Sequence, residues 1–493
     1  MKLKIFVAVF FFAAVSICDC GNIRKPAVAG GFYPEDPAEL TAMVDKFLSG
    51  ASRVELGGRL VALICPHAGY VYSGGVAGWS YKNIRPRDWD TVVILGTSHS
   101  YPFKGAALYA NGIFETPLGE FPVNEKFCAE LMKASPLFED SPSLHSQEHS
   151  VEVQLPFLAR VFGKPVPIVP IVMNSDDPEE CREIGLALAK TAKGKRVLLI
   201  ASSDFSHYPP SALCTKTDQT ALSAIETMDP EFLREADRIL LNRKEKNLAC
   251  ILCGESAVIS VMYAAKELGA NSPRILQYMN SGSMPGGDTG RAVGYAAVAF
   301  VQSRDKAKKD ITLKPYQKKY LLQFARQTIK NYLDNNKEPE FPLSDVPEYN
   351  LPGAVFVTLT KNKNLRGCVG TIQPVYTLEE AVGHSALSAA FEDHRFSPLS
   401  RYELSAVKVE ISILSPLRKV KNADEIIPMK DGVVVRRGGS SGLFLPQVWE
   451  QIPDKDAFLS ELCDQKAGLS RNAWKDASTE LYTFRVDNFS EGE

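Results

Sequence analysis

The chain has 493 residues, of which 45% are hydrophobic and 23% are charged, and its formal net charge is −2. A chain of this length is too long to fold around one ordinary hydrophobic core. A single-domain protein is therefore excluded, and two or more domains are expected. The nearly neutral charge provides no global field that attracts nucleic acid or an anionic membrane, so neither is expected as a partner.

The N-terminal segment has the pattern of a secretory signal. Lys2 and Lys4 precede an apolar run over residues 5–17, which is shorter than the roughly 20 residues that span a bilayer. We expect cleavage after Cys20, so that residues 1–20 are a signal peptide and the protein is exported to the periplasm or the extracellular space. A lipidated cysteine is less favoured because the residues before these cysteines suit it poorly. If the signal interpretation is wrong, the protein is cytoplasmic. No later segment is long and apolar enough for a transmembrane helix.

Residues 21–303 alternate strand-like and helix-like segments. Apolar, β-branched runs predict strands at residues 61–65, 91–95, 165–172, 196–201 and 292–301. Amphipathic segments predict helices at residues 36–48, 124–133, 177–192 and 253–268. This alternation is typical of a doubly wound α/β domain with a mainly parallel sheet.

Three of the apolar runs lead directly into a histidine. His67 follows the first run, His99 follows the second, and Asp204 and His207 follow the run over residues 196–201. Short, continuously apolar runs suit strands that are buried on both faces of a parallel sheet. Ligands bind just beyond the carboxyl ends of such strands. We therefore expect these side chains to belong to one site.

The residue types in this group favour a metal centre. Neutral imidazole is a common ligand of Fe, Cu and Zn, so His67 and His99 are predicted to be two ligands. Cys253 is the best candidate for the third, because it precedes an expected helix whose N-terminus favours the thiolate. Asp204 and His207 would complete the floor as a ligand, an orienting group or a proton-transfer pair. A single histidine after a strand is more often structural, so the metal-centre hypothesis rests on the convergence of three strand ends.

Two features of this half leave alternatives open. Cys250 and Cys253 have the spacing of a disulfide or a redox pair, although the strand that precedes a thioredoxin motif is missing. His149 and Glu152 would share one face if their segment were helical. His149 would then lie over the site as a base or an oxygen-binding donor, or it would simply belong to a capped helix start. Spacing alone does not decide between these two interpretations.

The composition changes after residue 303. Residues 304–313 are polar and charged, as linkers are, and a proline-led amphipathic segment at 315–333 predicts a long helix. The rest mixes short strands with helices, at residues 354–360, 406–414 and 432–437 for the strands and 378–391 and 455–463 for the helices. Residues 314–493 are therefore expected to form a smaller α+β domain of ordinary size.

Two polar motifs of the second domain are candidates for a cleft. Residues 365–372 form an apolar strand that contains Arg366 and the glycine-flanked Cys368, and residues 391–399 contain His394. In the functional interpretation these three side chains line one cleft, with Cys368 as a nucleophile for which the sequence identifies no base. The alternative, that the motifs are β-bulge and packing signatures, is favoured.

The motifs of the first half resemble those of the Memo family and occur in the family's order over about residues 24–303. They are Pro66–Tyr70, Gly96–His99, Glu148–Glu152, Ser203–His207, Cys253–Gly254 and Asp288–Tyr295. The resemblance implies a fold like that of class III extradiol dioxygenases, which are non-haem iron enzymes. It also implies one Fe(II) or copper ion bound by His67, His99 and Cys253. Cysteine replaces the carboxylate of the dioxygenase triad, and a softer thiolate favours redox or copper chemistry over ring cleavage.

Residues 314–490 resemble the AMMECR-type domain, whose biochemical role is unsettled. The resemblance rests on residues 365–372, 391–399, 442–448 and 462–468. Memo-like and AMMECR-type domains are associated with a radical-SAM protein in some microbes, in the AmmeMemoRadiSam system. The chain therefore resembles a fusion of two of the three parts, and a radical-SAM partner is implied. Export of the chain is difficult to reconcile with a radical-SAM partner, because radical-SAM clusters normally need a reducing cytosol.

Three functional hypotheses remain. The first is a metal-dependent oxidoreductase acting on O2 or a small phenolic or thiol substrate, in which Asp204 orients the site and His207 or His149 moves protons. The second is a non-catalytic module that binds a peptide or a metal, or acts as a scaffold. The third and least favoured is a metal-free hydrolase with Cys253 as nucleophile, His207 as base and Asp204 as orienting group. The sequence alone does not establish that the protein is an enzyme.

Overall fold

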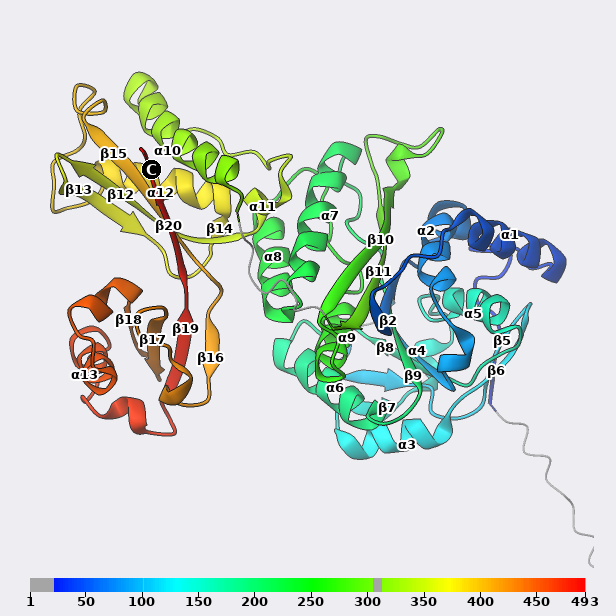
Figure 1. The fold of residues 1–493 in the computed structure, drawn as a ribbon. Helices are drawn as coiled ribbons and strands as arrows, with labels where there is room; N and C mark the ends of the chain where they lie inside the picture. Colours follow the sequence, from blue (N-terminus) through cyan, green and yellow to red (C-terminus); the bar gives the residue numbers. More distant parts are fainter. Residues whose placement is uncertain (1–21, 101, 305–312, 493) are drawn as a thin grey trace, which may run out of the picture.

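The structure, a computed structural model, describes residues 22–100, 102–304 and 313–492 (Figure 1). The expected signal peptide and residues 305–312 of the expected linker lie outside the described residues. The first part of the chain contains an eight-stranded sheet between helices, and the second part contains two smaller sheets. Within the described residues, no helix combines the length and the hydropathy needed to cross a membrane.

The large sheet is mixed and has a parallel centre. Four parallel strands occupy its middle, in the order β2 (Gly58–Cys65), β9 (Val197–Ser202), β3 (Thr91–Thr97) and β8 (Ile168–Met173). Antiparallel strands β11 (Gly294–Ser303) and β10 (Ser272–Asn280) extend it beyond β2. At the other edge, β4 (Ala106–Leu108) runs antiparallel to β8 and pairs with β7 (Phe138–Asp140). The predicted α/β class with a mainly parallel sheet is confirmed.

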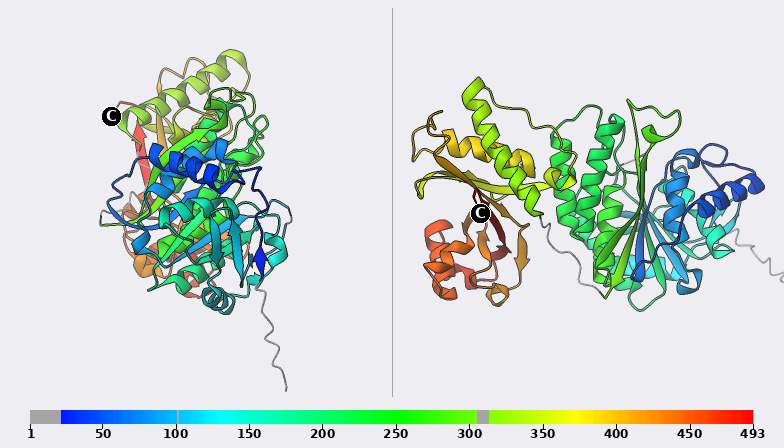
Figure 2. Two further views of the ribbon diagram at one scale, coloured as in Figure 1. Left: turned by 90° about the vertical axis from the view of Figure 1, so that its right-hand side faces the viewer. Right: turned by 45° about the horizontal axis from the view of Figure 1, so that its top comes forward.

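Helices cover both faces of this sheet (Figures 1 and 2). One face carries α6 (Pro178–Ala192), α7 (Ser211–Glu226), α8 (Pro230–Asn242) and α9 (Glu255–Glu267). The other carries α1 (Pro37–Gly50), α2 (Tyr70–Lys82) and α5 (Leu155–Phe162). The remaining elements are α3 (Glu125–Ala134), α4 (Pro142–His145) and a small sheet of β1 (Ile23–Arg24), β5 (Ile113–Thr116) and β6 (Gly119–Pro122).

Three predicted helices begin one residue later than expected. Asp36, Asn124 and Asp177, which open the predicted segments, are the N-cap residues of α1, α3 and α6. Each side chain accepts hydrogen bonds from backbone N–H groups of the first turn. A capping residue has a non-helical backbone, so the sequence signal that predicts the helix marks the residue before it.

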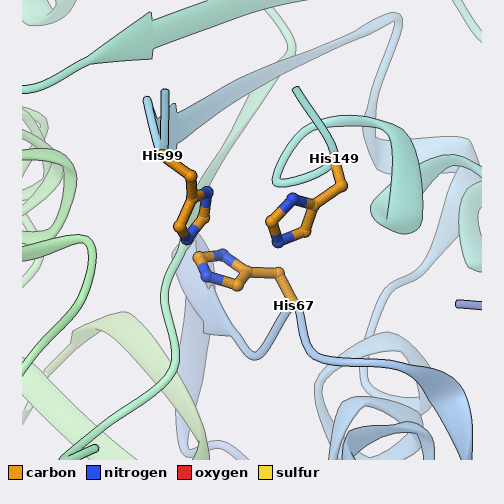
Figure 3. A group of neighbouring side chains, drawn as sticks. All are labelled: His67, His99 and His149. Atoms are coloured by element: carbon orange, nitrogen blue, oxygen red, sulfur yellow. The ribbon is translucent and has the colours of Figure 1, made fainter. Parts of the chain in front are cut away.

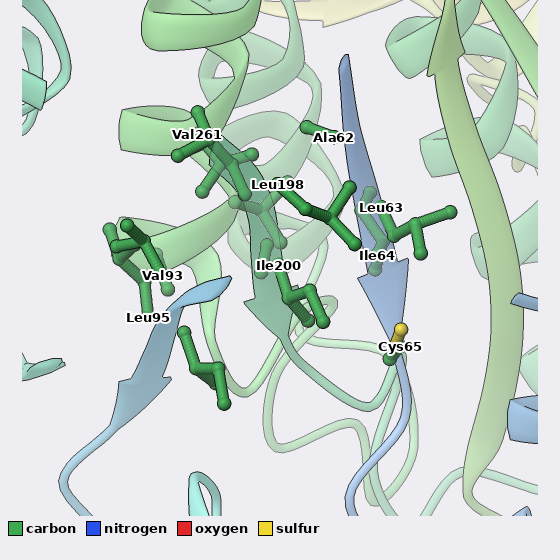
Figure 4. Packing of buried hydrophobic residues seen from close by; sticks show 14 of the residues in the cluster. Ala62, Leu63, Ile64, Cys65, Val93, Leu95, Leu198, Ile200 and Val261 are labelled. Carbon is green, nitrogen blue, oxygen red and sulfur yellow. The ribbon is translucent and has the colours of Figure 1, made fainter. Parts of the chain in front are cut away.

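The central strands bury side chains on both faces, which explains their unbroken apolar character (Figure 4). Leu63 and Ile64 of β2 and Leu198 of β9 have no exposed surface, and Val261 of α9 is equally buried among them. Burying one such side chain contributes about 1.5–3 kcal/mol relative to exposure. Because β2, β3 and β9 are parallel, their carboxyl ends meet at one edge of the sheet.

The second part has α+β architecture, as predicted. Its first sheet has the order β13 (Asn364–Gly370), β12 (Pro352–Lys361), β15 (Val407–Leu414) and β20 (Val486–Ser490), with β14 (Tyr376–Thr377) paired to β12. The helices α10 (Pro315–Asn335), α11 (Pro347–Asn350) and α12 (Leu378–Phe391) accompany it. Its second sheet has the order β16 (Arg418–Val420), β19 (Glu480–Phe484), β17 (Gly432–Arg437) and β18 (Ser440–Phe444), and α13 (Lys455–Glu461) packs with it.

The second part docks on the side of the first that carries α7 and α8 (Figure 1). Lys216 of α7 donates a hydrogen bond to the Leu343 carbonyl at 2.8 Å. Arg243, just after α8, forms an ion pair with Glu380 at 2.7 Å and donates to the Phe341 carbonyl at 2.7 Å. The two parts are therefore joined by directional contacts as well as by the chain.

Candidate metal centre

The carboxyl ends of β2, β3 and β9 bring the predicted histidines together. The register pairs Cys65 of β2 with Ser202 of β9, so the residues that follow each strand emerge side by side. Figure 3 shows His67, His99 and His149 with their rings turned toward a common point. Their ring centroids lie 4.3 Å apart for His99 and His149, and 5.2 and 5.4 Å from His67.

The surroundings of His67 leave one ring nitrogen free to bind a cation. The Ser202 hydroxyl donates to the Ser150 carbonyl at 2.6 Å, so its oxygen accepts from His67 Nδ1 at 3.1 Å. This assigns the proton of the neutral ring to Nδ1 and leaves the Nε2 lone pair 3.0 Å from the Cys253 sulfur. Burial, together with the neighbouring histidines, holds the pKa of His67 well below its usual value. The ring is therefore in its ligating form.

Glu148 orients the other two rings. Its Oε1 atom lies 3.0 Å from His99 Nδ1 and 3.5 Å from His149 Nδ1, and its Oε2 accepts the His99 backbone N–H at 2.8 Å. Burial opposes ionisation of Glu148, but its interactions with His99 and the N–H of Ser150 outweigh this and lower its pKa to about 2. A carboxylate that binds the second ring nitrogen of a ligating histidine is a common feature of metal sites.

Cys253 and Asp204 also contact His67, one at its ring and the other at its backbone. The Cys253 sulfur accepts the Asp204 N–H at 3.2 Å, and Asp204 Oδ1 accepts the His67 N–H at 2.8 Å. Cys253 precedes α9, as expected, but the expected stabilisation of its thiolate is not dominant. Burial and the nearby Asp204 raise the pKa of Cys253 well above its usual value. A cation at this point would favour the thiolate that burial disfavours.

The potential ligand atoms form two overlapping groups. The ring nitrogens of His67, His99 and His149 lie within 4.8 Å of one another, and so do the ligand atoms of His67, Asp204 and Cys253. The predicted ligands His67, His99 and Cys253 are thus distributed over both groups, with His67 common to the two. Imidazole nitrogen with thiolate sulfur suits Fe, Cu or Zn and suits Mg or Ca poorly. Each group therefore offers ligands that fit a transition-metal ion, and His99 and Cys253 fall in different groups that share His67.

His207 lies beside this cluster and has its own partners. Its Nδ1 atom is 3.0 Å from the Phe205 carbonyl and 3.3 Å from the Cys250 sulfur. Cys250 and Cys253 are both free thiols, so the disulfide that their spacing allowed is not formed. Because Cys253 contacts His67 whereas His207 contacts Cys250, the structure does not assemble the nucleophile–base pair of the hydrolase hypothesis.

The segment that carries His149 differs from the helix considered above. His149 lies in a loop, and the 3-10 helix Glu152–Gln154 that follows it leads directly into α5. Glu152 points away to form a buried ion pair with Arg24, and it also accepts hydrogen bonds from the Tyr33 hydroxyl at 2.5 Å and the Ala27 N–H at 2.8 Å. His149 instead packs against Phe32, at 4.6 Å between ring centroids.

Sequence reasoning missed Glu148 and Ser202 as residues that orient the site. Both adjoin residues that it had identified, since Glu148 precedes His149 and Ser202 ends the strand before Asp204. A carboxylate directly before a candidate ligand was the available signal for Glu148. Nothing in the sequence distinguishes Ser202 from the serine that follows it.

The second-domain candidates have partners of their own. Arg366 forms an ion pair with Glu403 at 3.2 Å, and Cys368 accepts from the Thr358 hydroxyl at 3.2 Å. Asp393 accepts the backbone N–H of Cys368 at 2.9 Å, while its neighbour His394 is exposed. The bond between Asp393 and Cys368 joins the two motifs, and the cleft of Arg366, Cys368 and His394 stays a prediction.

Comparison with known proteins assigns a family to each part of the chain. The Memo-like protein model matches residues 24–299 and the AMMECR1 model matches residues 322–489. A MEMO1 family protein of Nitrosopumilus maritimus is 36% identical over 284 residues, covering 57% of this chain and 100% of the relative. One from Methanocaldococcus jannaschii is 38% identical over 293 residues, covering 56% and 98%. Among solved structures, the uncharacterized protein PH0010 of Pyrococcus horikoshii is 36% identical and covers 35% of this chain and 90% of its own, with a TM-score of 0.32.

Proposed function

The chain belongs to the Memo family, and from this premise we propose that its first domain is a mononuclear iron- or copper-dependent oxidoreductase related to class III extradiol dioxygenases. The observation that carries the proposal is the hydrogen bonding of two converging histidines. Both His67 and His99 have Nδ1 engaged by an oxygen acceptor, which directs the lone pair of Nε2 toward the shared centre.

In this proposal His67, His99 and Cys253 hold the metal, which supplies a Lewis-acidic and redox-active centre when bound. Glu148 holds the His99 ring, and Asp204 holds the backbone at His67. The ring of His149 stacks on His99 and packs at a tilt against Phe32, and in this proposal it exchanges a proton with a bound substrate. His207 binds the Phe205 carbonyl through Nδ1, which leaves Nε2 for the same task.

We propose O2 and a small phenolic or thiol compound as substrates, since soft and nitrogen ligands suit redox chemistry of such molecules. Export rests on the N-terminal signal pattern, and a radical-SAM partner rests on the association of the two families. These two proposals make opposite demands on the compartment, because an iron–sulfur partner needs reducing conditions. The AMMECR-type domain carries a separate cavity.

The proposal is tested by the metal content of residues 21–493 purified without oxygen, beside His67→Ala and Cys253→Ser. We expect near-stoichiometric iron or copper in the parent and little in either variant. Cys368→Ser is the control, because Cys368 lies in the other domain and is also partly exposed. Retained metal in both site variants would overturn the ligand assignment. No metal in the parent after reconstitution, with ligand binding intact, would favour the non-catalytic module.

A further inference from the structure

A cavity of about 360 Å³ lies in the second domain, away from the metal centre. It is bounded by the C-terminal part of α10, by α12 and by the end of β13. Both sequence motifs of this domain contribute to its lining, through Val369 and Thr371 of one and Phe391 and Glu392 of the other. The predicted residues Arg366, Cys368 and His394 do not line it, so its chemistry comes from other side chains.

The charged residues that line this cavity are acidic, and both are exposed to solvent. Glu338 and Glu392 line it, and no lysine or arginine is among its described lining residues. Four other cavities in the described part of the chain each include a lysine or arginine. In the described structure the partners of the two carboxylates are uncharged or weakly basic groups. The His384 ring lies 2.8 Å from Glu338, and the Ser388 hydroxyl donates to Glu392 at 2.6 Å.

A third carboxylate near His384, that of Glu380, differs from these two because it pairs with an arginine. Glu380, 4.0 Å from the other nitrogen of His384, forms an ion pair with Arg243 of the first domain. The charge of Glu380 is therefore already balanced within the protein. Glu338 and Glu392 have no such cation in the described structure, so a positively charged group entering the cavity would meet two available acceptors.

Aromatic rings form the remaining walls. Tyr332 and Phe391 pack against each other at 4.7 Å between ring centroids, and Tyr376 stacks on His384 at 4.3 Å. The faces of such rings attract cations, and their bodies take up the apolar part of a ligand. The volume is at the lower end of the range for small-molecule sites.

We propose that this cavity binds a small organic cation, with a primary ammonium group carried on an apolar or aromatic body. Glu338 and Glu392 provide the charge that recognises the ammonium group. Tyr332, Tyr376 and Phe391 contact the body of the ligand. The site is independent of the metal centre, so the proposal does not rest on the oxidoreductase function. Free amines and lysine side chains share the same ammonium group, and the probes below separate these two sources.

The test is isothermal titration calorimetry of residues 21–493 with 2-phenylethylamine, its neutral analogue 2-phenylethanol and its anionic analogue 3-phenylpropanoate. We expect the amine to bind about tenfold or more tightly than the alcohol and the anion to bind weakest. The double variant Glu338→Gln with Glu392→Gln should lose that preference. Glu340→Gln is the matched control, because it removes a carboxylate from the same segment outside the lining.

Two further probes locate the site and identify its occupant. Tyr376→Leu should weaken amine binding about five- to tenfold, since it removes one aromatic wall and keeps the charge. Nα-acetyl-lysine methylamide binding more tightly than 2-phenylethylamine assigns the site to a peptide side chain, and the reverse assigns it to a free amine. No amine binding at millimolar concentration, equal binding of the alcohol, or unchanged binding by the double variant would each overturn the proposal.

Discussion

Glu148 binds His99 through both the ring and the backbone. One carboxylate oxygen lies 3.0 Å from His99 Nδ1 and the other accepts the His99 N–H at 2.8 Å. The first of these oxygens also lies 3.5 Å from Nδ1 of His149. One buried carboxylate thus sets the orientation of two of the three rings that face the candidate metal centre.

Replacing Glu148 should therefore weaken metal binding without removing a ligand. In Glu148→Gln the amide keeps one acceptor but loses the charge that holds the ring proton on Nδ1, and we expect affinity for iron or copper to fall about 10–100-fold. Competition with a chelator of known affinity measures the change. Glu139→Gln, at an exposed position of β7, is the control and should bind as the parent does. Equal affinity of both variants would contradict the orienting role.

Removing Arg24 should strongly destabilise the first domain. Its side chain is 2% exposed and that of its partner Glu152 is fully buried, so Arg24→Ala leaves a buried charge without its cation. Such a loss costs about 3–5 kcal/mol in the free energy of unfolding. The neighbouring pair of Lys25 and Glu115 is exposed, with 69% exposure for Lys25, so Lys25→Ala should change stability by less than about 1 kcal/mol. Urea denaturation compares the two, and similar losses would refute the assignment.

The buried carboxyl of Asp218 predicts a pH dependence of stability. Burial raises the pKa of Asp218 to about 6, despite hydrogen bonds from the Ser206 N–H and the Tyr278 hydroxyl. Between the unfolded pKa near 4 and the folded pKa, the folded state keeps a proton that the unfolded state has released. The free energy of unfolding therefore falls as pH rises through this interval, by up to about 3 kcal/mol, and is constant above it.

The variant Asp218→Asn isolates this effect, because asparagine does not titrate. The stability of the parent relative to the variant should be larger at pH 4 than at pH 7, and urea denaturation at several pH values measures the difference. Asp288→Asn is a suitable control, since Asp288 is exposed. A difference between parent and Asp218→Asn that does not change with pH would show that Asp218 is ionised in the folded protein throughout this range.

The contact between the two domains should weaken when Arg243 is replaced. Its side chain is 12% exposed, and Arg243→Ala removes the ion pair with Glu380 and the bond to the Phe341 carbonyl. We expect a loss of about 1–3 kcal/mol in the free energy of unfolding, together with a larger radius of gyration by small-angle X-ray scattering. Arg182→Ala removes a guanidinium that is 50% exposed and pairs with Glu179 of the same helix, so it should have little effect. An unchanged radius in Arg243→Ala would mean that the remaining contacts, among them that of Lys216 with Leu343, are sufficient to hold the domains together.

The sequence by itself determined the elements and the sheet edge at which the site lies. Short, unbroken apolar runs such as 61–65 suit strands that are buried on both faces. Such strands predict a parallel centre for the sheet. Capping residues such as Asp36 mark helix starts because their side chains bind the first turn locally. His67 and His99 come just after the ends of predicted strands, which places them at the carboxyl edge of the sheet. These features depend on neighbours in the chain, so local patterns are sufficient to predict them.

Only the tertiary structure decided which side chains meet. Cys253 contacts His67 across 186 positions of the chain, and Glu148 reaches His99 across 49. His149 lies in a loop against Phe32, which no helical periodicity predicts. The cavity bounded by Glu338 and Glu392 likewise joins segments that are separate in sequence. Such pairings depend on how strands and loops pack in three dimensions, and this packing is a property of the whole core rather than of any local segment.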